Sequence, residues 1–423
     1  MTDSSLPFSP ADILVPCVKE PQKWSVVACD QYTSQPDYWQ QTAAYVGDAP
    51  STLHLVFPEI YLHNADFGAR IEKINASMHQ YINNKLLDEY TESYFYIERK
   101  VTSGKVRRGL IGKVDLLQYD YNKGAESLIR ATEGTVLERI PPRVKIRENA
   151  PLELPHVMLL IDDEADAVIG KVAAQKGSFE KIYDFDLMQG GGNIKGWRVS
   201  TAAAAGVAEA LKLLGDQSAF DKKYGITGKK VLQFAVGDGN HSLATAKECY
   251  NKLAATLPPE EALAHPARYA LVELVNLHDP SLEFEAIHRV VFGINPEQLL
   301  TELFQRYDCA YGCGEGQAFD YVTKDGAGTI TVKNPASTLA VGTLQLFLDD
   351  YLSRFGGKID YIHGRDVTET LAREPGNIGF ILPAMEKPDL FKTVILDGAL
   401  PRKTFSMGEA CEKRFYLEAR RIR

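Results

Sequence analysis

Long apolar runs are missing from this chain of 423 residues. The run at residues 156–161 is among the longest, and it is far shorter than the roughly 20 apolar residues that cross a bilayer. Residues 1–5 have no basic stretch that leads into an apolar core, so we expect no signal peptide. These two absences predict a cytoplasmic protein that has no membrane partner.

Cysteines are few and basic residues are outnumbered. The six cysteines are scattered, and Cys309 and Cys313 have no second pair of ligands nearby in the sequence, which argues against a disulfide framework and against a zinc site. The net charge of −9 would repel a phosphate backbone. We therefore expect no nucleic-acid partner. The sequence leaves the oligomeric state open.

Composition and patterning predict a folded α/β or α+β protein with mixed sheets and flanking helices. Hydrophobic residues make up 45% of the chain, and 423 residues exceed the size of a single core. Prolines at 151 and 155 mark one boundary. We expect an N-terminal α/β domain at residues 1–150, a core domain at 151–295 and a C-terminal α/β segment at 296–423 that completes the fold.

Alternating and helical patterns predict the individual elements. Strands are expected at residues 94–101, 110–117, 156–161, 231–236, 269–275, 329–332, 359–362 and 378–382. Helices are expected at residues 67–87, 296–304 and 344–355, and another should start after Ser200 and stop at Gly215.

A polar, glycine-containing turn stands out between the apolar strand at 231–236 and a helix that carries Leu243, Ala246 and Tyr250 at helical spacing. The turn has the sequence Gly-Asp-Gly-Asn-His-Ser, residues 237–242. A helix N-terminus carries partial positive charge, and glycine lets the main chain approach an anion closely. The turn therefore predicts a phosphate site, although its polar residues also suit a simple turn with an N-cap.

A family resemblance rests on this turn. Residues 238–246, Asp-Gly-Asn-His-Ser-Leu-Ala-Thr-Ala, resemble the Asp-Gly-His-His-Arg…Thr-Ala signature of an uncharacterised-domain family, DUF 1015. That family is similar to the ParB/sulfiredoxin-like superfamily, which includes free serine kinases. Asn240 and Ser242 depart from the signature. Because Ser242 replaces an arginine, another cation has to contact the phosphate.

Three further segments extend the resemblance along the chain. Residues 132–135 resemble a His-Glu-x-Thr element, His288-Arg289 resembles the end of a Pro-Thr-His-Arg element, and residues 400–404 resemble a Met-Pro-x-Lys-Ser-Thr element. The resemblance implies a ParB/sulfiredoxin-like phosphate-binding core. It also implies a phosphotransferase that acts on free L-serine, reversibly to phosphoserine, with pyrophosphate or ATP/ADP as donor and Mg²⁺ as expected cofactor.

Roles follow for the candidate residues. Asp238 is the expected base or Mg²⁺ ligand, His241 a proton donor, and Glu133 an alternative base that only the resemblance favours. Arginines at 139 and 143 are the expected replacement for the missing cation, because a guanidinium grips phosphate well. The full set expected to bind the donor is Gly237, Gly239, Asn240, Ser242, Thr245, Arg139, Arg143, His288, Arg289 and Lys403.

Two alternatives stay open at this point. One is a ParB-like module that binds nucleotide without catalysis. The other is a metal-dependent phosphohydrolase built around His278 and His288. A sulfiredoxin-like reductase is disfavoured, because its chemistry needs a thiolate in the turn and no cysteine lies between Cys29 and Cys249.

Overall fold

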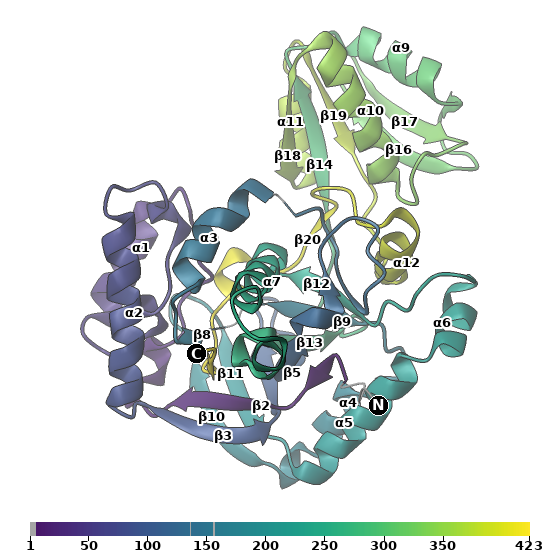
Figure 1. Cartoon of the computed structure of the whole chain (residues 1–423). Helices are drawn as coiled ribbons and strands as arrows, with labels where there is room; N and C mark the ends of the chain where they lie inside the picture. Colours follow the sequence, from purple (N-terminus) through teal and green to yellow (C-terminus); the bar gives the residue numbers. More distant parts are fainter. Residues whose placement is uncertain (1–5, 136, 155–156) are drawn as a thin grey trace. The chain divides into compact units, whose positions relative to one another are not determined.

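The computed structural model describes residues 6–135, 137–154 and 157–423 (Figure 1). These residues form two compact units. Unit 1 holds the chain up to Ala131, Thr135–Leu282 and Gly408–Arg423; unit 2 holds Thr132–Gly134 and Glu283–Met407. This division differs from the three segments that the sequence predicts, because unit 1 continues across residue 150 and regains the chain at residue 408.

The elements of unit 1 include most of the strands. They are β1 (Phe8–Ser9), β2 (Ala11–Pro16), β3 (Leu87–Ser93), β4 (Phe95–Lys100), β5 (Val106–Asp115), β6 (Tyr119–Asp120), β7 (Ile129–Ala131), β8 (Leu152–Glu153), β9 (Met158–Ile161), β10 (Glu180–Asp186), β11 (Asn193–Arg198), β12 (Phe234–Asp238), β13 (Tyr269–Asn276) and β21 (Arg420–Arg421). Its helices are α1 (Pro36–Val46), α2 (Phe67–Asn83), α3 (Ile140–Arg147), α4 (Ile169–Ala174), α5 (Thr201–Leu214), α6 (Gln217–Tyr224), α7 (Asn240–Ala254) and α8 (Pro259–Ala264).

A mixed sheet organises unit 1. Its strand order is β10-β11-β4-β5-β13-β9-β12-β7-β6, and β1 pairs with β5. Strand β12 runs parallel to β7 and antiparallel to β9. The sheet thus joins strands from both sides of residue 150, and this is why the prolines at 151 and 155 do not separate two domains.

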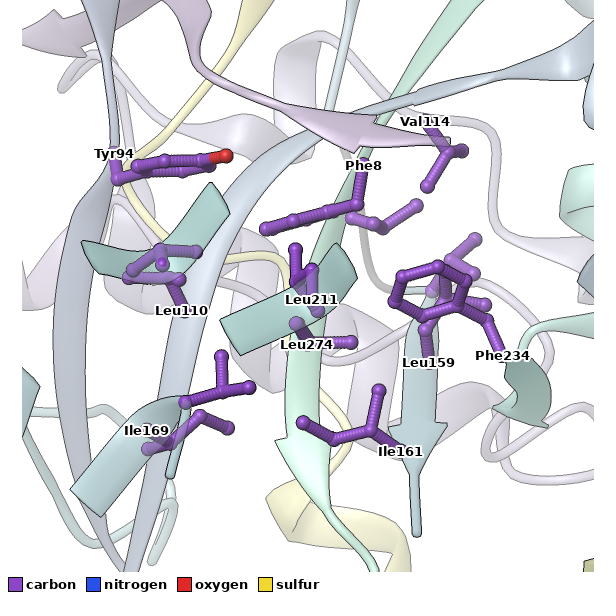
Figure 2. Packing of buried hydrophobic residues seen from close by; sticks show 14 of the residues in the cluster. Phe8, Tyr94, Leu110, Val114, Leu159, Ile161, Ile169, Leu211, Phe234 and Leu274 are labelled. Carbon is purple, nitrogen blue, oxygen red and sulfur yellow. The ribbon is translucent and has the colours of Figure 1, made fainter. Parts of the chain in front are cut away.

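Two hydrophobic cores cover the sheet of unit 1. Side chains alternate between the faces of a strand, so Tyr94 and Tyr96 enter one core while Phe95 and Ile97 enter the other. The first core is closed by the apolar faces of α4, α5 and α7, and Figure 2 shows Leu211 from α5 near Phe8 and Phe234. Full burial of one such side chain stabilises the fold by about 2 kcal/mol. Helix α7 is therefore held firmly, and so is the turn that precedes it.

Unit 2 has its own sheet, in the order β15-β17-β16-β19-β14-β18, with β20 paired to β14. Its strands are β14 (Glu285–Phe292), β15 (Cys309–Tyr311), β16 (Gln317–Val322), β17 (Ala327–Val332), β18 (Lys358–His363), β19 (Asn377–Ile381) and β20 (Phe405–Ser406). Its helices are α9 (Pro296–Arg306), α10 (Ala340–Phe355), α11 (Arg365–Ala372) and α12 (Lys387–Asp397). All its strand pairs are antiparallel.

The predicted fold class, a mixed α/β protein, is confirmed, and most predicted elements are found within a few residues. Ser200 caps α5 through a hydrogen bond from the Ala203 N–H, as its position predicts. The strand expected from residue 156 is observed from Met158, and Pro155 and His156 lie outside the described residues. In the described part of the chain, no helix has both the length and the apolar character that a membrane crossing requires.

Candidate functional site

The turn after β12 has a shape that only glycine at position 239 suits. Gly239 has φ +84°, in the left-handed region, and a Cβ there would lie 3.0 Å from the Val157 Cα. A Cβ at Gly237 would lie 2.8 Å from the Leu160 Cγ. Both glycines are thus explained by close packing against β9 and the residue before it. A substitution at Gly239 would test folding of the turn rather than anion contact.

Asp238 ends β12 and is the fixed carboxylate of this turn. Its Oδ1 accepts a hydrogen bond from the Gly239 N–H at 2.8 Å, and its Oδ2 lies 3.2 Å from the Lys413 Nζ. The two side chains are 26% and 29% exposed, so the pair is reachable from solvent. A carboxylate and an ammonium group therefore stand together at the start of α7.

His241 lies on the first turn of α7, where it stays neutral. Burial lowers its pKa most, and the positive charges of Arg143 and Arg139 lower it further, to about 4, against a small opposing effect of Asp30. The two arginines predicted to supply the missing cation are thus close enough to act on this imidazole. A neutral imidazole can donate one hydrogen bond and accept another at neutral pH.

Arg143 comes from α3, which follows the short 3-10 turn Leu137–Arg139. Prolines at the start of α3 suit the first helical turn. The Arg143 guanidinium donates to the Glu59 carboxylate, and through Nη1 to the Arg139 carbonyl at 2.7 Å. Cys29 belongs to the same cluster, because the charges of Glu59 and Arg143 both act on it and burial raises the pKa of its thiol well above its ordinary value. This thiol is unsuited to nucleophilic work.

The remaining turn residues have mixed outcomes. Asn240 and Ser242 lie half-buried at the start of α7, as a phosphate contact would need. Thr245 is buried, and its hydroxyl donates to the His241 carbonyl at 2.7 Å within the helix. The hydroxyl that we predict to bind the donor therefore has a structural partner, and it orients His241 indirectly.

Four of the predicted site residues belong to unit 2. Glu133 forms a β-bridge with Leu400. Lys403 is exposed and has φ +54°, which is rare for a residue other than glycine. His288 and Arg289 lie inside β14, an interior strand to which β18, β19 and β20 all pair.

His288 and Arg289 have structural partners, which weakens their predicted contact with a donor. The His288 Nδ1 accepts a hydrogen bond from the Leu382 N–H at 3.2 Å. The Arg289 side chain is fully buried, where it donates to the Gln345 side chain and to the carbonyls of Ile287 and Arg402. Burial lowers the pKa of this guanidinium to about 10. The buried Arg289 side chain therefore links β14 to α10 and to the segment around Arg402.

A third group could coordinate a metal ion by distance alone. One ligand atom from each of Asp162, Glu164 and His278 lies within 4.8 Å of the others. The Lys223 ammonium already stands 2.8 Å from Asp162 and 3.5 Å from Glu164. Burial raises the pKa of Asp162, but hydrogen bonds from Lys223, Tyr224 and His278 outweigh it and lower that pKa below its ordinary value. The Lys223 ammonium therefore already neutralises part of the negative charge of this group.

The hydrolase alternative needs His278 and His288 as metal ligands. His278 belongs to unit 1 and His288 to unit 2, and each has a hydrogen-bond partner inside its own unit. The two histidines are explained without a metal ion, so they do not support a metal-dependent phosphohydrolase.

The residues at the turn do fit Mg²⁺. Magnesium takes oxygen ligands, and in phosphoryl-transfer sites it is held by one or two carboxylates together with substrate phosphates. Asp238 offers one carboxylate, 26% exposed, directly before the start of α7, and the Lys413 ammonium, which also suits phosphate, lies 3.2 Å from it. A donor set of this kind matches an ion that arrives with its phosphate ligand.

Sequence reasoning missed three members of the cluster: Lys413, Glu59 and Asp30. They come from segments far from the turn, and long-range pairing brings them in: the Ala28 N–H donates to the Lys413 carbonyl at 2.7 Å, and the Glu59 N–H to the Cys29 carbonyl at 2.9 Å. No local pattern marks these residues. Only the charge missing at Ser242 signalled that a distant cation was needed.

Unit 1 is a mixed α/β scaffold. Its strand-to-helix turn carries the Asp238 carboxylate and the neutral His241, and the cations nearby are Lys413, Arg143 and Arg139. The chain belongs to the family described as protein of unknown function (DUF1015), and the match covers residues 16–351. No curated protein matches it.

Solved structures with a distant likeness to the chain include a free serine kinase in complex with AMP. That protein has 10% sequence identity and a TM-score of 0.37, with 74% of this chain and 90% of that chain covered. SbnI with a C-terminal truncation, from Staphylococcus aureus, has 9% identity and a TM-score of 0.35, with 70% and 82% covered. A conserved hypothetical protein from Pyrococcus furiosus has 11% identity and a TM-score of 0.29, with 47% and 83% covered.

Proposed function

We propose that this protein is a phosphotransferase that moves a phosphoryl group between pyrophosphate or a nucleotide and the hydroxyl of free L-serine. The observation that carries the proposal is the charge gathered at the start of α7: the Asp238 carboxylate lies 3.2 Å from the Lys413 ammonium, and the charges of Arg143 and Arg139 act on His241, three residues further along the chain. Phosphoryl transfer needs mainly positioning and charge neutralisation, with one carboxylate near the acceptor. The cluster offers both.

The chemistry assigns simple roles to these groups. The serine hydroxyl oxygen forms a new bond to phosphorus while the bridging O–P bond of the donor breaks, and its electron pair leaves with the phosphate or nucleotide. The hydroxyl proton passes to the Asp238 carboxylate and then to solvent or to the leaving group. In this proposal His241, which is neutral at pH 7, donates a hydrogen bond to the leaving oxygen.

The cations of the cluster neutralise the negative charge of the donor phosphates. Arg143 and Arg139 contact the donor phosphates from α3 and the turn before it, and the N-terminus of α7 adds its partial positive charge. In its alternative role as a metal ligand, Asp238 would hold Mg²⁺ together with donor oxygens, and the ion would supply further charge neutralisation.

The direct test is a donor screen on the full chain. Purified protein is incubated with Mg²⁺, L-serine and, in separate reactions, pyrophosphate, ATP or ADP, and phosphoserine is measured by ³¹P NMR. We expect one donor to give phosphoserine, and the reverse reaction to consume phosphoserine. Asp238→Asn should lower the rate by about 100-fold or more and leave the circular dichroism spectrum unchanged, because the change is isosteric.

Two outcomes decide against the proposal. If no donor yields phosphoserine and phosphoserine is not consumed, the assignment of L-serine is wrong. If ATP or ADP raises the melting temperature but no phosphoryl group moves, the alternative of a nucleotide-binding module without catalysis is favoured. Asp120→Asn is the matched control, since Asp120 also closes a turn in unit 1, by accepting from the Asn122 N–H at 2.9 Å.

A further inference from the structure

The C-terminal segment Gly408–Arg423 places a lysine at the candidate site although it is distant from the turn in sequence. Lys413 Nζ lies 3.2 Å from Asp238 Oδ2, and its side chain is 29% exposed. The segment is tied to unit 1 by its backbone: the Lys413 carbonyl accepts from the Ala28 N–H at 2.7 Å, and the Phe415 N–H donates to the Val26 carbonyl at 3.1 Å.

Both neighbours of Lys413 are buried and held. Glu412 is 6% exposed, and its Oε1 accepts from the N–H and the hydroxyl of Thr102, each at 2.6 Å. Arg414 is 2% exposed, and its Nε donates to the Cys411 carbonyl at 2.7 Å. Because the residues on each side are fixed, the backbone of Lys413 is fixed as well. Its partly exposed side chain projects from a rigid base.

The Lys413 ammonium supplies a positive charge that the turn at residues 237–242 lacks. Residues 237–242 contain neither lysine nor arginine, so the turn has no permanent cation of its own. Arg143 shares its charge with the Glu59 carboxylate. A lysine ammonium is a compact point charge and a common phosphate ligand, and it needs no fixed fork geometry.

We propose that Lys413 binds the transferring phosphoryl group, and that Asp238 holds its ammonium in position between turnovers. This inference rests on the proposed phosphotransferase function. When the donor enters, the ammonium hydrogen-bonds to non-bridging oxygens of the phosphoryl group. The Asp238 carboxylate, which held it, then faces the acceptor hydroxyl.

The competing assignment is Lys403, the lysine of the Met-Pro-x-Lys-Ser-Thr-like element. Lys403 belongs to unit 2 and lies exposed in a turn, where the Thr404 hydroxyl donates to the Pro401 carbonyl at 2.6 Å. Resemblance favours Lys403, whereas the ion pair with Asp238 favours Lys413. Kinetics can separate the two.

The experiment compares Lys413→Met, Lys413→Arg and Lys403→Met in the full chain, with Lys212→Met as control because Lys212 is an exposed residue of α5. Steady-state kinetics are measured with the donor and with L-serine varied in turn. For Lys413→Met we expect kcat/KM for the donor to fall about 100-fold, while KM for L-serine changes by less than about twofold. Lys413→Arg should recover part of the loss, since it keeps the positive charge.

Each result counts for or against the inference. Wild-type donor kinetics in Lys413→Met, or a donor defect in Lys403→Met instead, would overturn it even if Asp238→Asn is inactive and the proposed function therefore stands. If the wild type makes no phosphoserine, the proposed function is wrong. The change in melting temperature on addition of pyrophosphate then still tests whether Lys413 binds the anion. A pyrophosphate-induced rise that Lys413→Met loses and Lys413→Arg keeps supports it, and an equal rise in all variants overturns it.

Discussion

The two units each contain a histidine next to an arginine charge, and the contrast between them separates a site from a scaffold. In unit 1, His241 is half-buried and Arg143 is paired with a carboxylate, Glu59. In unit 2, Arg289 is fully buried and bonded to neutral acceptors, and His288 accepts a main-chain N–H. In both places burial and nearby positive charge lower the pKa of the histidine. The two histidines therefore have similar electrostatic surroundings but differ in accessibility: His241 is partly exposed, whereas His288 and Arg289 are buried.

The largest effect should come from the scaffold arginine. Arg289→Met should destabilise the protein by about 3 kcal/mol, because three acceptors, two of them in buried hydrogen bonds, lose their donor. Urea unfolding followed by circular dichroism measures this loss. If the variant unfolds like the wild type but has lost phosphotransfer, Arg289 acts on the substrate and the contrast between the units is broken.

The turn of unit 1 should respond through its backbone. Gly239→Ala should cost about 1–2 kcal/mol, since alanine is strained at φ +84° and its Cβ would crowd Val157. Gly206→Ala is the control: Gly206 lies in α5 with nothing within 4 Å of the added Cβ, and the change should stabilise the helix by up to about 1 kcal/mol. Equal melting temperatures for the two variants would contradict the role of Gly239 in shaping the turn.

The site arginine should affect binding more than folding. Arg143→Ala is expected to raise the donor KM about tenfold with little change in the KM for L-serine, because the proposed function assigns its charge to the donor phosphates. Lys145→Ala, an exposed position on the same helix, serves as the control. Unchanged donor kinetics in Arg143→Ala would make it a structural partner of Glu59, much as Arg289 is structural in unit 2.

The smallest effect is a titration. His241 should titrate near its pKa of about 4, well below its ordinary 6.5. Since the unfolded chain then binds more protons in this interval, stability should increase as pH rises from about 4 to about 6.5. Arg143→Ala removes a positive charge and should move the midpoint upward. An NMR titration of the imidazole checks both, and a wild-type midpoint near 6.5 would show that the arginine charges do not reach the ring.

Local chemistry made much of the fold predictable. Ser200, Gly215 and the apolar spacing of α5 define that helix in the sequence, and the pattern at 269–275 gives β13 almost to the residue. β14 was missed, because His288 and Arg289 interrupt its apolar pattern and the partners that bury them lie 94 and 113 residues away. Polar residues in an interior strand are compatible with burial only through contacts that a linear pattern does not contain.

The candidate site likewise contains residues that a local sequence pattern reveals and residues that it does not. Asp238, His241 and the glycines are adjacent in sequence, so the turn was found directly, and the roles given to them stay predictions. Lys413, Glu59 and Asp30 reach the cluster through long-range pairing, as with the hydrogen bond between Ala28 and Lys413. The predicted domain boundary near residue 150 differs from the observed division for a related reason: β5 and β13 pair across it.

The return of residues 408–423 to unit 1 has a consequence for biosynthesis. During translation, residues 283–407 of unit 2 emerge from the ribosome before residues 408–423 do. Unit 1 therefore cannot be completed until all residues of unit 2 have been synthesised. Until then Glu153 lacks Arg420, its ion-pair partner at 2.7 Å, and Asp238 lacks Lys413. A polypeptide that stops before residue 408 would carry the turn but an incomplete cluster, so synthesis of residues 408–423 is a condition for assembling the proposed centre.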